Sequence, residues 1–438
     1  MARSLEEWLA RQEAAHPKSI DLGLTRVAAV ARQLGIDRSA APVITVGGTN
    51  GKGSTAAHLE ALCLAAGRSV GLFTSPHFLR YNERIRIDGR EVEDAQIVAA
   101  FERIEAARGA ISLTFFEYNT LAALQLFAER GVELALLEVG LGGRLDATNL
   151  MDADVAVVCS IGFDHRDWLG ETLEEIGAEK AGIFRSGRPA ILGTARMPAS
   201  VYSTIATLGA RSIVAETDFT WRLTSCPNGR PRWSYRGLRL SLDDLPPSVL
   251  AGSIQYRNAA TALAALEALA AEGARYTAAR EVLRALDART VAAALGRVRL
   301  AGRFQIVPGA VEWILDIAHN PPAAEVLAAQ LEERPCQGRT LAVVGILADK
   351  DAPAIGAALA PAVDGWVLCS LEGPRGISAA ALARRLEGVV HDPSLAGSVR
   401  AGCEVARAAV RSGDRVVVCG SVHTVGPALD WLGVYSTG

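Results

Sequence analysis

A glycine-rich stretch between a strand-like run and a helical pattern constrains the fold of this chain more than any other feature. Residues 46–55 read VGGTNGKGST; the apolar run VITV (43–46) leads into them, and the helical pattern STAAHLEALCLAAG (54–67) follows. A strand, a glycine loop and a helix in this order predict a phosphate-binding loop, with Lys52 beside the β- and γ-phosphates of a nucleotide. An ordinary glycine-rich turn is the alternative, but strand, lysine and helix together favour the phosphate loop.

The loop departs from the usual pattern G-x-x-x-x-G-K-[ST] at two positions. Val46 replaces the first glycine, and Gly53 stands where a magnesium-binding hydroxyl is expected. Ser75 follows the apolar run SVGLF (69–73), at the strand edge where open α/β sheets bind ligands, and could supply the missing hydroxyl. On its own, however, the pair Ser75-Pro76 is more typical of a simple turn.

The pattern of apolar runs predicts the class of fold. SVGLF (69–73), ELALLEVG (133–140) and DVAVVCSIG (154–162) are short and apolar, as buried strands are, and helical patterns separate them. This alternation predicts a doubly wound, mostly parallel α/β sheet of the phosphate-loop ATPase type. Residues 215–250 alternate apolar and polar side chains and predict a small antiparallel patch. A helix ending at a glycine is expected over 258–274, and a charged helix near 279–295.

A second α/β domain is predicted in the C-terminal part. GRVRLAGRF (296–304) has the composition of a hinge, so the predicted domains are 1–296 and 297–438. Beyond it VEWILDIA, TLAVVGIL, GWVLCS and RVVVCGS are strand candidates, with helical segments at 323–333, 378–387 and 398–411, which indicates a Rossmann-like sheet. Polar turns are expected at 346–353, 372–378 and 420–427, and Asp316, His319 and Asn320 lie between a strand and a proline-opened helix. We expect these groups to line an interdomain cleft.

Composition excludes several classes of function. The chain has 438 residues, a net charge of −3 and no Lys/Arg-rich run, so nothing indicates binding of nucleic acid or of an anionic membrane. It contains neither a signal peptide pattern nor an apolar run of the ~18 residues that a spanning helix needs. Seven cysteines without a C-x-x-C motif do not indicate disulfides or zinc. We expect a cytoplasmic protein that acts on small molecules.

Further charged groups are expected at the edge of the first sheet. Glu138 ends a buried apolar run, where a carboxylate is costly unless it is paired or binds a metal. Magnesium, which prefers oxygen ligands, suits this position; a salt bridge to Arg144 is the alternative. His165 follows the next apolar run, and Lys180 lies in the helical stretch after it. A cation near magnesium should be repelled unless it is neutral or chemically modified.

Across nearly its whole length the sequence resembles the folylpolyglutamate synthase and dihydrofolate synthase family, within the larger Mur ligase superfamily. The matching motifs are GTNGKGS (48–54), TSPH (74–77), NERI (82–85), LTFFEYNT (113–120), EVGLGGRLDATN (138–149), IGFDH (161–165), EKAGI (179–183), AGRFQ (301–305), DIAHNP (316–321) and HTVGP (423–427). They run in the family's order and together are highly specific, whereas GTNGK alone would indicate only the superfamily.

The resemblance implies an ATP-dependent ligase. The expected reaction joins L-glutamate to dihydropteroate, and to the glutamate tail of reduced folates, through an acyl phosphate, as in the bifunctional bacterial members. It assigns Mg²⁺, one or two ions, to Ser75, Glu138 and His165, and it implies that CO₂ converts Lys180 into an anionic carbamate. The catalytic residues are then expected to be Lys52, His165, Lys180 and Arg303.

The remaining contacts are also implied by the resemblance. ATP is assigned to Thr49, Asn50, Gly51, Lys52, Ser54, Asn258, Arg303 and Asp316. The acceptor and the amino acid are assigned to Ile20, Asp21, Leu22, Thr114, Leu145 and His319. The expected partners are ATP, dihydropteroate, reduced folates and L-glutamate, with no nucleic acid and no membrane, and the family leans towards monomers.

Three alternatives remain at this point. A cell-wall Mur ligase would carry a further domain before the glycine loop, but only about forty residues precede it here. A nucleotide-binding regulatory protein needs the glycine loop but not Ser75, His165 and Lys180. Within the family, the chain could carry only one of the two ligase activities.

Overall fold

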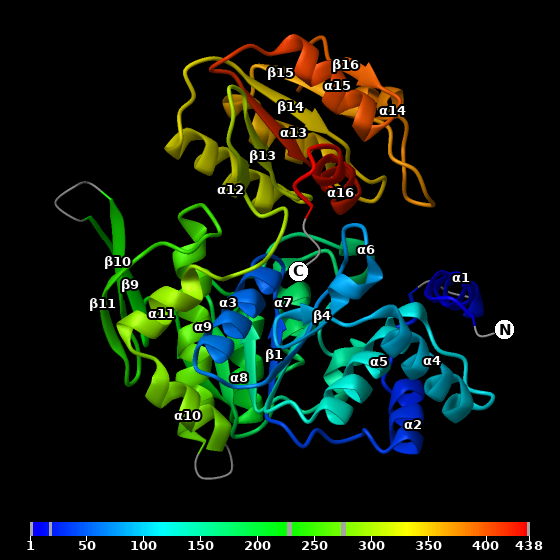
Figure 1. The fold of residues 1–438 in the computed structure, drawn as a ribbon, viewed down its shortest axis with the longest axis vertical. Helices are drawn as coiled ribbons and strands as arrows, with labels where there is room; N and C mark the ends of the chain where they lie inside the picture. Colours follow the sequence, from blue (N-terminus) through cyan, green and yellow to red (C-terminus); the bar gives the residue numbers. More distant parts are fainter. Residues whose placement is uncertain (1–2, 17–19, 226–229, 273–276, 436–438) are drawn as a thin grey trace.

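The computed structural model of the chain describes residues 3–16, 20–225, 230–272 and 277–435. It contains two α/β domains, and in Figure 1 the C-terminal domain, coloured yellow to red, lies above the larger N-terminal domain. The fold class predicted from the sequence is confirmed. The boundary between residues 296 and 297 stays a prediction.

The N-terminal domain is built around an eight-stranded sheet in the order β4-β3-β2-β5-β1-β6-β7-β8. Strands β2, β5, β1, β6, β7 and β8 pair in parallel, and β3 and β4 are antiparallel additions at one edge. The strands are β1 (Val43–Gly47), β2 (Val70–Phe73), β3 (Ile85–Ile87), β4 (Arg90–Glu91), β5 (Leu134–Glu138), β6 (Val155–Val158), β7 (Pro189–Leu192) and β8 (Arg211–Val214).

Helices cover both faces of this sheet because alternate strand residues point to opposite sides. Ile44 and Val46 of β1 pack into one core cluster, whereas Val43 packs into the other. The first face carries α3 (Lys52–Ala65), α9 (Ile254–Ala271), α10 (Thr277–Ala285) and α11 (Ala288–Leu295). The opposite face carries α1 (Leu5–Ala15), α2 (Thr25–Leu34), α4 (Asp94–Arg108), α5 (Phe115–Arg130), α7 (Leu173–Ala181) and α8 (Ala199–Leu208).

The antiparallel patch predicted over 215–250 is confirmed. It consists of β9 (Thr220–Ser225), β10 (Pro231–Arg236) and β11 (Ser241–Leu245), which form a separate three-stranded sheet. Trp233 and Tyr235 are fully buried where this sheet packs against the helices of the first face. The patch therefore extends that helical layer and lies at the side of the molecule away from α1 (Figure 1).

The two helices predicted on either side of residue 275 have different outcomes. Residues 279–295 form two helices, because Asp287 accepts a hydrogen bond from the backbone of Thr290 and starts α11 as a new helix. The predicted end of the preceding helix at Gly273 lies outside the described residues, and the described part of α9 ends at Ala271.

The C-terminal domain has a six-stranded sheet in the order β12-β13-β17-β14-β15-β16. Its strands are β12 (Gln305–Val307), β13 (Glu312–Leu315), β14 (Thr340–Val344), β15 (Gly365–Cys369), β16 (Ser394–Ala396) and β17 (Arg415–Cys419), of which only β12 runs antiparallel among these. Its helices are α12 (Pro321–Glu333), α13 (Ala352–Leu359), α14 (Ala379–Arg385), α15 (Val399–Ala409) and α16 (Val422–Trp431). The four predicted strands are present, and β12, β16 and α13 had no predicted counterpart.

The polar turn predicted at 420–427 is wrong, since α16 begins at Val422. Ser421 caps this helix, and the buried side chains of Val425, Ala428 and Leu429 pack on the sheet. Tertiary packing therefore outweighs the local preference of Gly426 and Pro427 for a turn.

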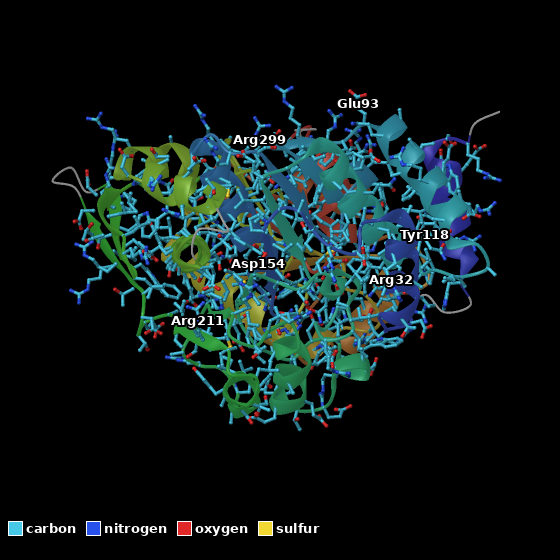
Figure 2. All side chains as sticks on the ribbon, turned by 90° about the horizontal axis from the view of Figure 1, so that it is seen from below. Arg32, Glu93, Tyr118, Asp154, Arg211 and Arg299 are labelled. Atoms are coloured by element: carbon cyan, nitrogen blue, oxygen red, sulfur yellow. The ribbon has the colours of Figure 1, made fainter. Side chains whose placement is uncertain are left out.

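Charged side chains are exposed on the surface of the described part of the protein. Glu93, Arg211 and Arg299 are exposed at the outside of the N-terminal domain (Figure 2). Within the described residues no helix combines the length and apolar character needed to cross a membrane. The six cysteines of that part are free thiols. The cytoplasmic location stays a prediction.

Candidate active site

The glycine loop connects β1 to α3 and has the geometry of an anion site. Gly48 and Gly51 have φ of 128° and 91°, and a Cβ on Gly48 would lie 3.0 Å from the backbone nitrogen of Cys159. The backbone nitrogen of Thr49 donates to the carbonyl of Ser160 at 2.7 Å. These contacts hold the loop against the end of β6. No side chain caps α3, so the N–H groups of its first turn remain available to a phosphate.

Two lysines converge on this loop. Lys52 Nζ donates to the carbonyl oxygens of Gly48 at 3.0 Å and Thr49 at 3.1 Å, and Lys180 Nζ donates to Gly48 at 3.2 Å. Burial, together with the neighbouring charge of Lys52, lowers the pKa of Lys180 to about 7. A substantial fraction of Lys180 is therefore a neutral amine at neutral pH.

Glu138 ends β5 and lies fully buried between the loop and β2. Burial raises its pKa, against which the charges of Lys52 and Arg303 act. Oε2 accepts a hydrogen bond from the backbone nitrogen of Ser75 at 3.3 Å. The alternative salt bridge to Arg144 is not formed, because the Arg144 guanidinium pairs with Glu179 at 2.9 Å.

The incomplete phosphate-loop pattern has a structural counterpart at Gly53. A Cβ at this position would lie 3.7 Å from both carboxylate oxygens of Glu138. The helix start therefore faces the carboxylate directly, and Ser75 approaches the same carboxylate from β2. This arrangement is the one expected if the hydroxyl missing at Gly53 comes from Ser75.

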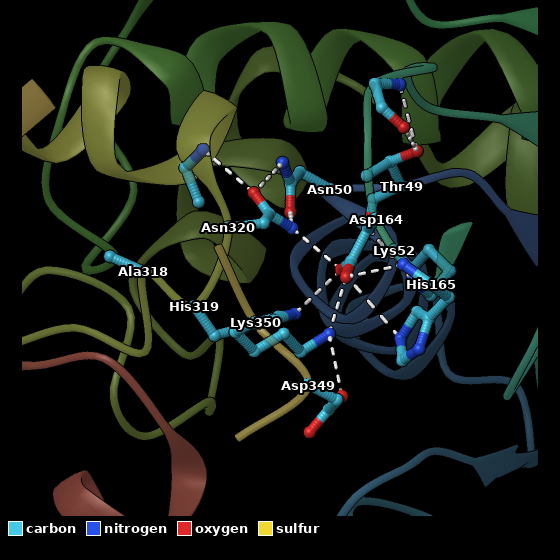
Figure 3. Close-up of polar contacts among 12 residues, drawn as sticks. Thr49, Asn50, Lys52, Asp164, His165, Ala318, His319, Asn320, Asp349 and Lys350 are labelled. Atoms are coloured by element: carbon cyan, nitrogen blue, oxygen red, sulfur yellow. Dashed lines mark hydrogen bonds and ion pairs between the residues drawn. The ribbon is translucent and has the colours of Figure 1, made fainter. Parts of the chain in front are cut away.

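Asp164 joins the two domains at the cavity (Figure 3). Its carboxylate accepts hydrogen bonds from Lys350 Nζ at 2.5 Å and Asn320 Nδ2 at 2.9 Å, and it lies 3.1 Å from Nε2 of His319. Burial raises the pKa of Asp164, but the hydrogen bond and charge of His319 and the charge of Lys350 outweigh it and hold this pKa well below its ordinary value. Asp164 is therefore an anion that anchors C-terminal side chains.

His165 follows Asp164 and has φ of 53°. Its Nε2 lies 3.8 Å from Oδ2 of Asp164. Burial lowers the pKa of His165 to about 3, although the Asp164 charge acts in the opposite direction. A neutral imidazole results, which is the form that ligates metals.

Four of the residues predicted to contact ATP make hydrogen bonds within the protein. Asp316 accepts from the backbone nitrogens of Phe304 at 2.7 Å and Ala318 at 2.9 Å, which fixes the turn that carries Arg303. Asn258 donates to Gln255 at 3.0 Å. The Thr49 hydroxyl bonds to the backbone of Gly162, and the Asn50 amide bonds to Asn320. Their roles towards a nucleotide stay predictions.

The predicted acceptor residues lie at the other end of the cavity. Asp21 forms an ion pair with Arg26 at 2.6 Å, and this contact holds the loop that carries Ile20 and Leu22. Thr114 begins α5, where its hydroxyl accepts from the backbone of Glu117 at 3.2 Å. The loop around Asp21 and the start of α5 therefore form rigid parts of the cavity wall.

One cavity of about 1420 Å³ receives every residue predicted for the site. These are Ile20, Asp21, Leu22, Thr49, Asn50, Gly51, Lys52, Ser54, Ser75, Thr114, Glu138, Leu145, His165, Lys180, Asn258, Arg303, Asp316 and His319. The sequence analysis did not assign Arg84 or Asp164 to the site, and it expected Asn320 and the turn that carries Lys350 in the cleft without a role; all four residues line the cavity. Asp164, Asn320 and Lys350 follow strands at the expected edges, so their positions were the available signal.

Lysine usage gives a second signal for Lys350. The sequence has four lysines, at positions 18, 52, 180 and 350, and uses arginine for the other long cations. Lys52, Lys180 and Lys350 line the cavity, while Lys18 lies outside the described residues. Every lysine among the described residues therefore lines the cavity.

The residues assigned to magnesium fit a sparse, water-rich site. The described residues contain no group of three or more His, Cys, Asp or Glu side chains that could hold a metal ion. The predicted set has only two such side chains, Glu138 and His165, with the Ser75 hydroxyl and a modified Lys180 beside them. Magnesium keeps several waters and is bound by one or two protein oxygens together with substrate phosphates. A buried carboxylate next to a phosphate loop is compatible with that chemistry.

Two protein-family models match this chain, one within each α/β domain. Residues 46–195 match the Mur ligase middle domain, and residues 302–422 match the glutamate ligase domain of Mur ligases. The first match contains the glycine loop, and the second contains Arg303, Asp316 and His319.

Individual proteins are similar over the whole length. The dihydrofolate synthase/folylpolyglutamate synthase of Escherichia coli (strain K12) is 44% identical over 438 residues, which is 100% of this chain and 97% of that protein. The structure of E. coli FolC in complex with DHPP and ADP has a TM-score of 0.89 at 43% identity, covering 99% of this chain and 98% of that one. A bifunctional folylpolyglutamate synthase/dihydrofolate synthase with Mn, AMPPNP and L-glutamate bound has a TM-score of 0.87 at 42% identity, with 98% of each chain covered.

Proposed function

We infer the function of this protein from one premise: the chain belongs to the dihydrofolate synthase/folylpolyglutamate synthase family of Mur ligases. It is an ATP-dependent ligase that joins L-glutamate to dihydropteroate and to the glutamate tail of reduced folates. The observation that carries this assignment is the single cavity in which the glycine loop, the predicted acceptor loop and the edge of the C-terminal sheet meet.

The reaction proceeds in two steps, the formation of an acyl phosphate and then of an amide. A carboxylate oxygen of the acceptor attacks the γ-phosphorus of ATP, the bond from phosphorus to the bridging oxygen breaks, and ADP leaves with the electron pair. The amino nitrogen of glutamate then attacks the acyl carbon, the bond to phosphate breaks, and the amine proton is released to water. Phosphoryl transfer asks the protein mainly for positioning and charge stabilisation.

Lys52 and the loop backbone supply the phosphate contacts. In the structure Lys52 Nζ rests on the carbonyls of Gly48 and Thr49. An ammonium group has three donors, so Lys52 can keep a loop contact while it donates to the β- and γ-phosphates. The free N–H groups at the start of α3 bind the same anion. Together they place the γ-phosphorus beside Glu138 and Ser75.

Relatives with AMPPNP carry manganese, and a divalent metal is part of the proposed function. Ser75, Glu138 and His165 would hold it, and when bound it offsets the repulsion between the acceptor carboxylate and the triphosphate. The chain itself prepares this site by keeping His165 neutral and by burying Glu138 with one backbone donor.

We extend the proposal to a carbamate on Lys180. The neutral amine of Lys180 can attack CO₂ at carbon, which yields a carbamate anion and releases one proton. The anion would replace a cation that now competes with Lys52 for the same carbonyl oxygen of Gly48. With only four lysines in the chain, ¹³CO₂ should give a resolvable carbamate NMR signal that disappears in Lys180→Ala. No such signal in active protein would contradict this part of the proposal.

Arg303 contributes from the C-terminal domain. Its side chain lines the cavity, and its charge acts on both Glu138 and Asp316. We propose that it stabilises the transferring phosphoryl group when the domains are docked. Docking would then be part of catalysis, because the phosphate loop and Arg303 come from different sheets.

The test is phosphate release from ATP with L-glutamate and either 7,8-dihydropteroate or tetrahydrofolate as acceptor, in CO₂-supplied buffer. Turnover with both acceptors is the expected result. Turnover with one alone would reduce the function to a single synthase activity. ATP hydrolysis that ignores both acceptors would favour a nucleotide-binding regulatory protein. Since one chain supplies every predicted residue, we propose that the monomer is active.

A further inference from the structure

Arg84 is a buried cation in the cavity that neither the phosphate contacts nor the proposed metal site uses. It ends the short 3₁₀ helix Tyr81–Arg84 before β3, and only 8% of its surface is exposed. Its side chain lines the cavity. Its carbonyl accepts from the backbone nitrogen of Thr74 at 2.9 Å, which places Arg84 next to Ser75.

The partners of Arg84 within the described residues are neutral. Nε donates to Nδ1 of His77 at 2.7 Å, and the guanidinium lies 5.9 Å from the Tyr81 ring and 5.5 Å from the Phe115 ring. Because Nδ1 of His77 accepts this hydrogen bond, it carries no proton, and the imidazole is uncharged. Aromatic faces attract a guanidinium only weakly. Among the residues that the structure describes, the charge of Arg84 therefore has no counter-ion within contact distance.

Both carboxylates near enough to influence Arg84 are committed elsewhere. Glu83 accepts from the backbone nitrogens of Phe78, Leu79 and Arg80 at 2.8 Å each, and from the Tyr435 hydroxyl at 2.7 Å. These bonds fold the loop after Pro76 and attach the C-terminal tail to it. Glu138 bonds to the backbone of Ser75 and faces the proposed metal site.

An unpaired buried guanidinium is costly in a protein, and such groups pair with an anion. His77 occupies Nε, which leaves the two terminal nitrogens as donors. These two nitrogens form a planar fork that matches the spacing of a carboxylate. The hydrogen bond to His77 also fixes the plane of this fork. Arg84 is thus preorganised to bind an anionic ligand.

The position of Arg84 identifies which part of a substrate reaches it. Arg84 bonds to Thr74, the neighbour of Ser75, and its guanidinium lies 5.5 Å from the ring of Phe115, the neighbour of Thr114, which is predicted to contact the pterin; Ser75, Thr114 and Phe115 all line the cavity. An acceptor that spans these two regions presents its reacting carboxylate between them. Nucleotide phosphates have their own donors in Lys52 and the first turn of α3.

We propose that Arg84 binds the reacting carboxylate of the acceptor through its two terminal nitrogens, and that His77 is the positioning residue that orients it. This inference rests on the proposed ligase function. The carboxylate is the nucleophile that attacks the γ-phosphorus, so its orientation decides whether a lone pair points at phosphorus. Both acceptors of the two activities share this group, and Arg84 serves both.

A binding experiment isolates the contact from catalysis. The ligands are 7,8-dihydropteroate and the same dihydropterin carrying aniline, which lacks the carboxyl group, both measured with magnesium and AMPPNP present. A charge-assisted pair predicts that wild type binds the acid ~10- to 100-fold more tightly than the aniline compound. Arg84→Met should remove this difference. Arg80→Met is the matched control, because Arg80 lies on the same loop, is 43% exposed and pairs with Glu91; it should retain the difference.

An unchanged preference for the acid in Arg84→Met would overturn the proposal. Should this variant not fold, Arg84→Lys provides the second test: a single ammonium keeps the charge and loses the fork, and part of the preference should remain. An unchanged preference in Arg84→Lys would likewise overturn the bidentate contact. Thermal unfolding of each variant shows whether it folds.

Steady-state kinetics show which anion binds the two terminal nitrogens of Arg84. The expected result for Arg84→Met is a KM for acceptor raised ~10- to 100-fold with both dihydropteroate and tetrahydrofolate, with the KM for ATP within about twofold of wild type. A raised KM for ATP would assign the fork to a phosphate and overturn the proposal. A defect with tetrahydrofolate alone would assign it to the α-carboxylate of the tail and overturn it as well.

Failure of the Arg84 proposal can be told apart from failure of the proposed ligase function, because different measurements test the two. Wild-type phosphate release with the two acceptors tests the ligase activity itself. The preference of wild type for the acid over the aniline compound, and its loss in Arg84→Met, tests the subsite in the absence of turnover.

The positioning role of His77 has its own test. His77→Phe should raise the acceptor KM while leaving kcat/KM for ATP unchanged, and His77→Asn, which retains a hydrogen-bond acceptor, should restore part of the loss.

Discussion

The side-chain amides of Asn50 and Asn320 exchange two hydrogen bonds, of 3.0 and 3.1 Å, between the glycine loop and the first turn of α12. Asn320 also caps α12 and donates to Asp164. The phosphate loop is therefore tied directly to the C-terminal domain. Separation of that domain from the glycine loop would break this amide pair, so we expect domain docking to depend on both residues.

Asn320→Ala should weaken docking as well as the helix. Loss of the cap costs ~1 kcal/mol of stability, and loss of the interdomain bonds should lower kcat ~10-fold. Ser378→Ala is the matched control, since Ser378 caps α14 in the same domain and does not line the cavity. We expect a similar fall in Tm for both variants and a fall in kcat for Asn320→Ala only. Equal kcat values would show that the amide pair does not matter for turnover.

The Asp164–Lys350 pair should show strong energetic coupling. The side chains are 7% and 6% exposed, and removing one partner leaves the other charge buried. Asp164→Asn and Lys350→Met should each cost ~3–5 kcal/mol of unfolding free energy, and the double variant should cost clearly less than their sum. Urea unfolding of the four proteins measures this coupling. Strict additivity would mean that the two groups do not interact in solution.

Lys52→Ala should abolish ATP-dependent ligation, because the variant loses the loop's ammonium group, which is expected to contact the β- and γ-phosphates. The fold should survive, since within the described part of the chain Nζ of Lys52 bonds to the carbonyls of Gly48 and Thr49 alone. The measurement is phosphate release together with circular dichroism. Ligation near the wild-type rate would mean that the loop is not a phosphate site.

Glu138 and Glu60 are both buried carboxylates, but only Glu60 forms an ion pair within the described residues, so replacing them should affect stability differently. Burial raises the pKa of Glu138, so its charged form destabilises the metal-free protein at neutral pH. Glu138→Gln should raise the stability of the metal-free protein and lower turnover by about 100-fold or more. Burial raises the pKa of Glu60 as well, but Arg86 contacts Glu60 at 2.6 Å and loses its partner in Glu60→Gln, so this variant should gain less stability than Glu138→Gln. Calorimetry without metal, and turnover with magnesium, provide the readouts; a destabilised Glu138→Gln would contradict the assignment.

Much of this site could be predicted because strand, loop and helix patterns are local. The apolar runs before Gly47, Thr74, Val139 and Cys159 fixed the strands, and parallel strands bring their carboxyl ends to one edge. The roles of the metal and acceptor residues came from motifs shared with a family. Neither source depends on knowing which side chains touch.

The parts that failed depend on contacts between distant residues. Lys350 lies in a short polar turn, and nothing in its local sequence indicates an ion pair with Asp164. Arg84 looked like an ordinary residue of the NERI motif, because burial without a counter-ion cannot be seen in a sequence. The helix at Val422 was missed because Gly426 and Pro427 favour a turn locally, whereas packing of Val425 and Leu429 decides the structure.

His58 should make the stability of the protein depend on pH between about 4 and 6.5. It lies on α3, where Nδ1–H donates to the carbonyl of Ser54 at 2.7 Å, and Nε2 accepts from the Ser248 hydroxyl at 3.1 Å. Burial lowers its pKa from 6.5 to about 4, against the raising effect of the Ser54 bond. Below pH 6.5 the unfolded chain binds a proton that the folded chain does not bind until about pH 4.

Protons therefore favour the unfolded chain in this window, and the His58 contribution to the free energy of unfolding should fall by about 3 kcal/mol as the pH drops through it. Above pH 6.5 this contribution is fully present. His58→Asn retains a donor for Ser54 and cannot titrate, so its unfolding free energy should depend less on pH. Urea unfolding at pH 7, 5.5 and 4.5 measures the difference between the two proteins, in which the other titrating groups cancel. Parallel curves would show that His58 is already protonated, or solvent-exposed, in the folded protein.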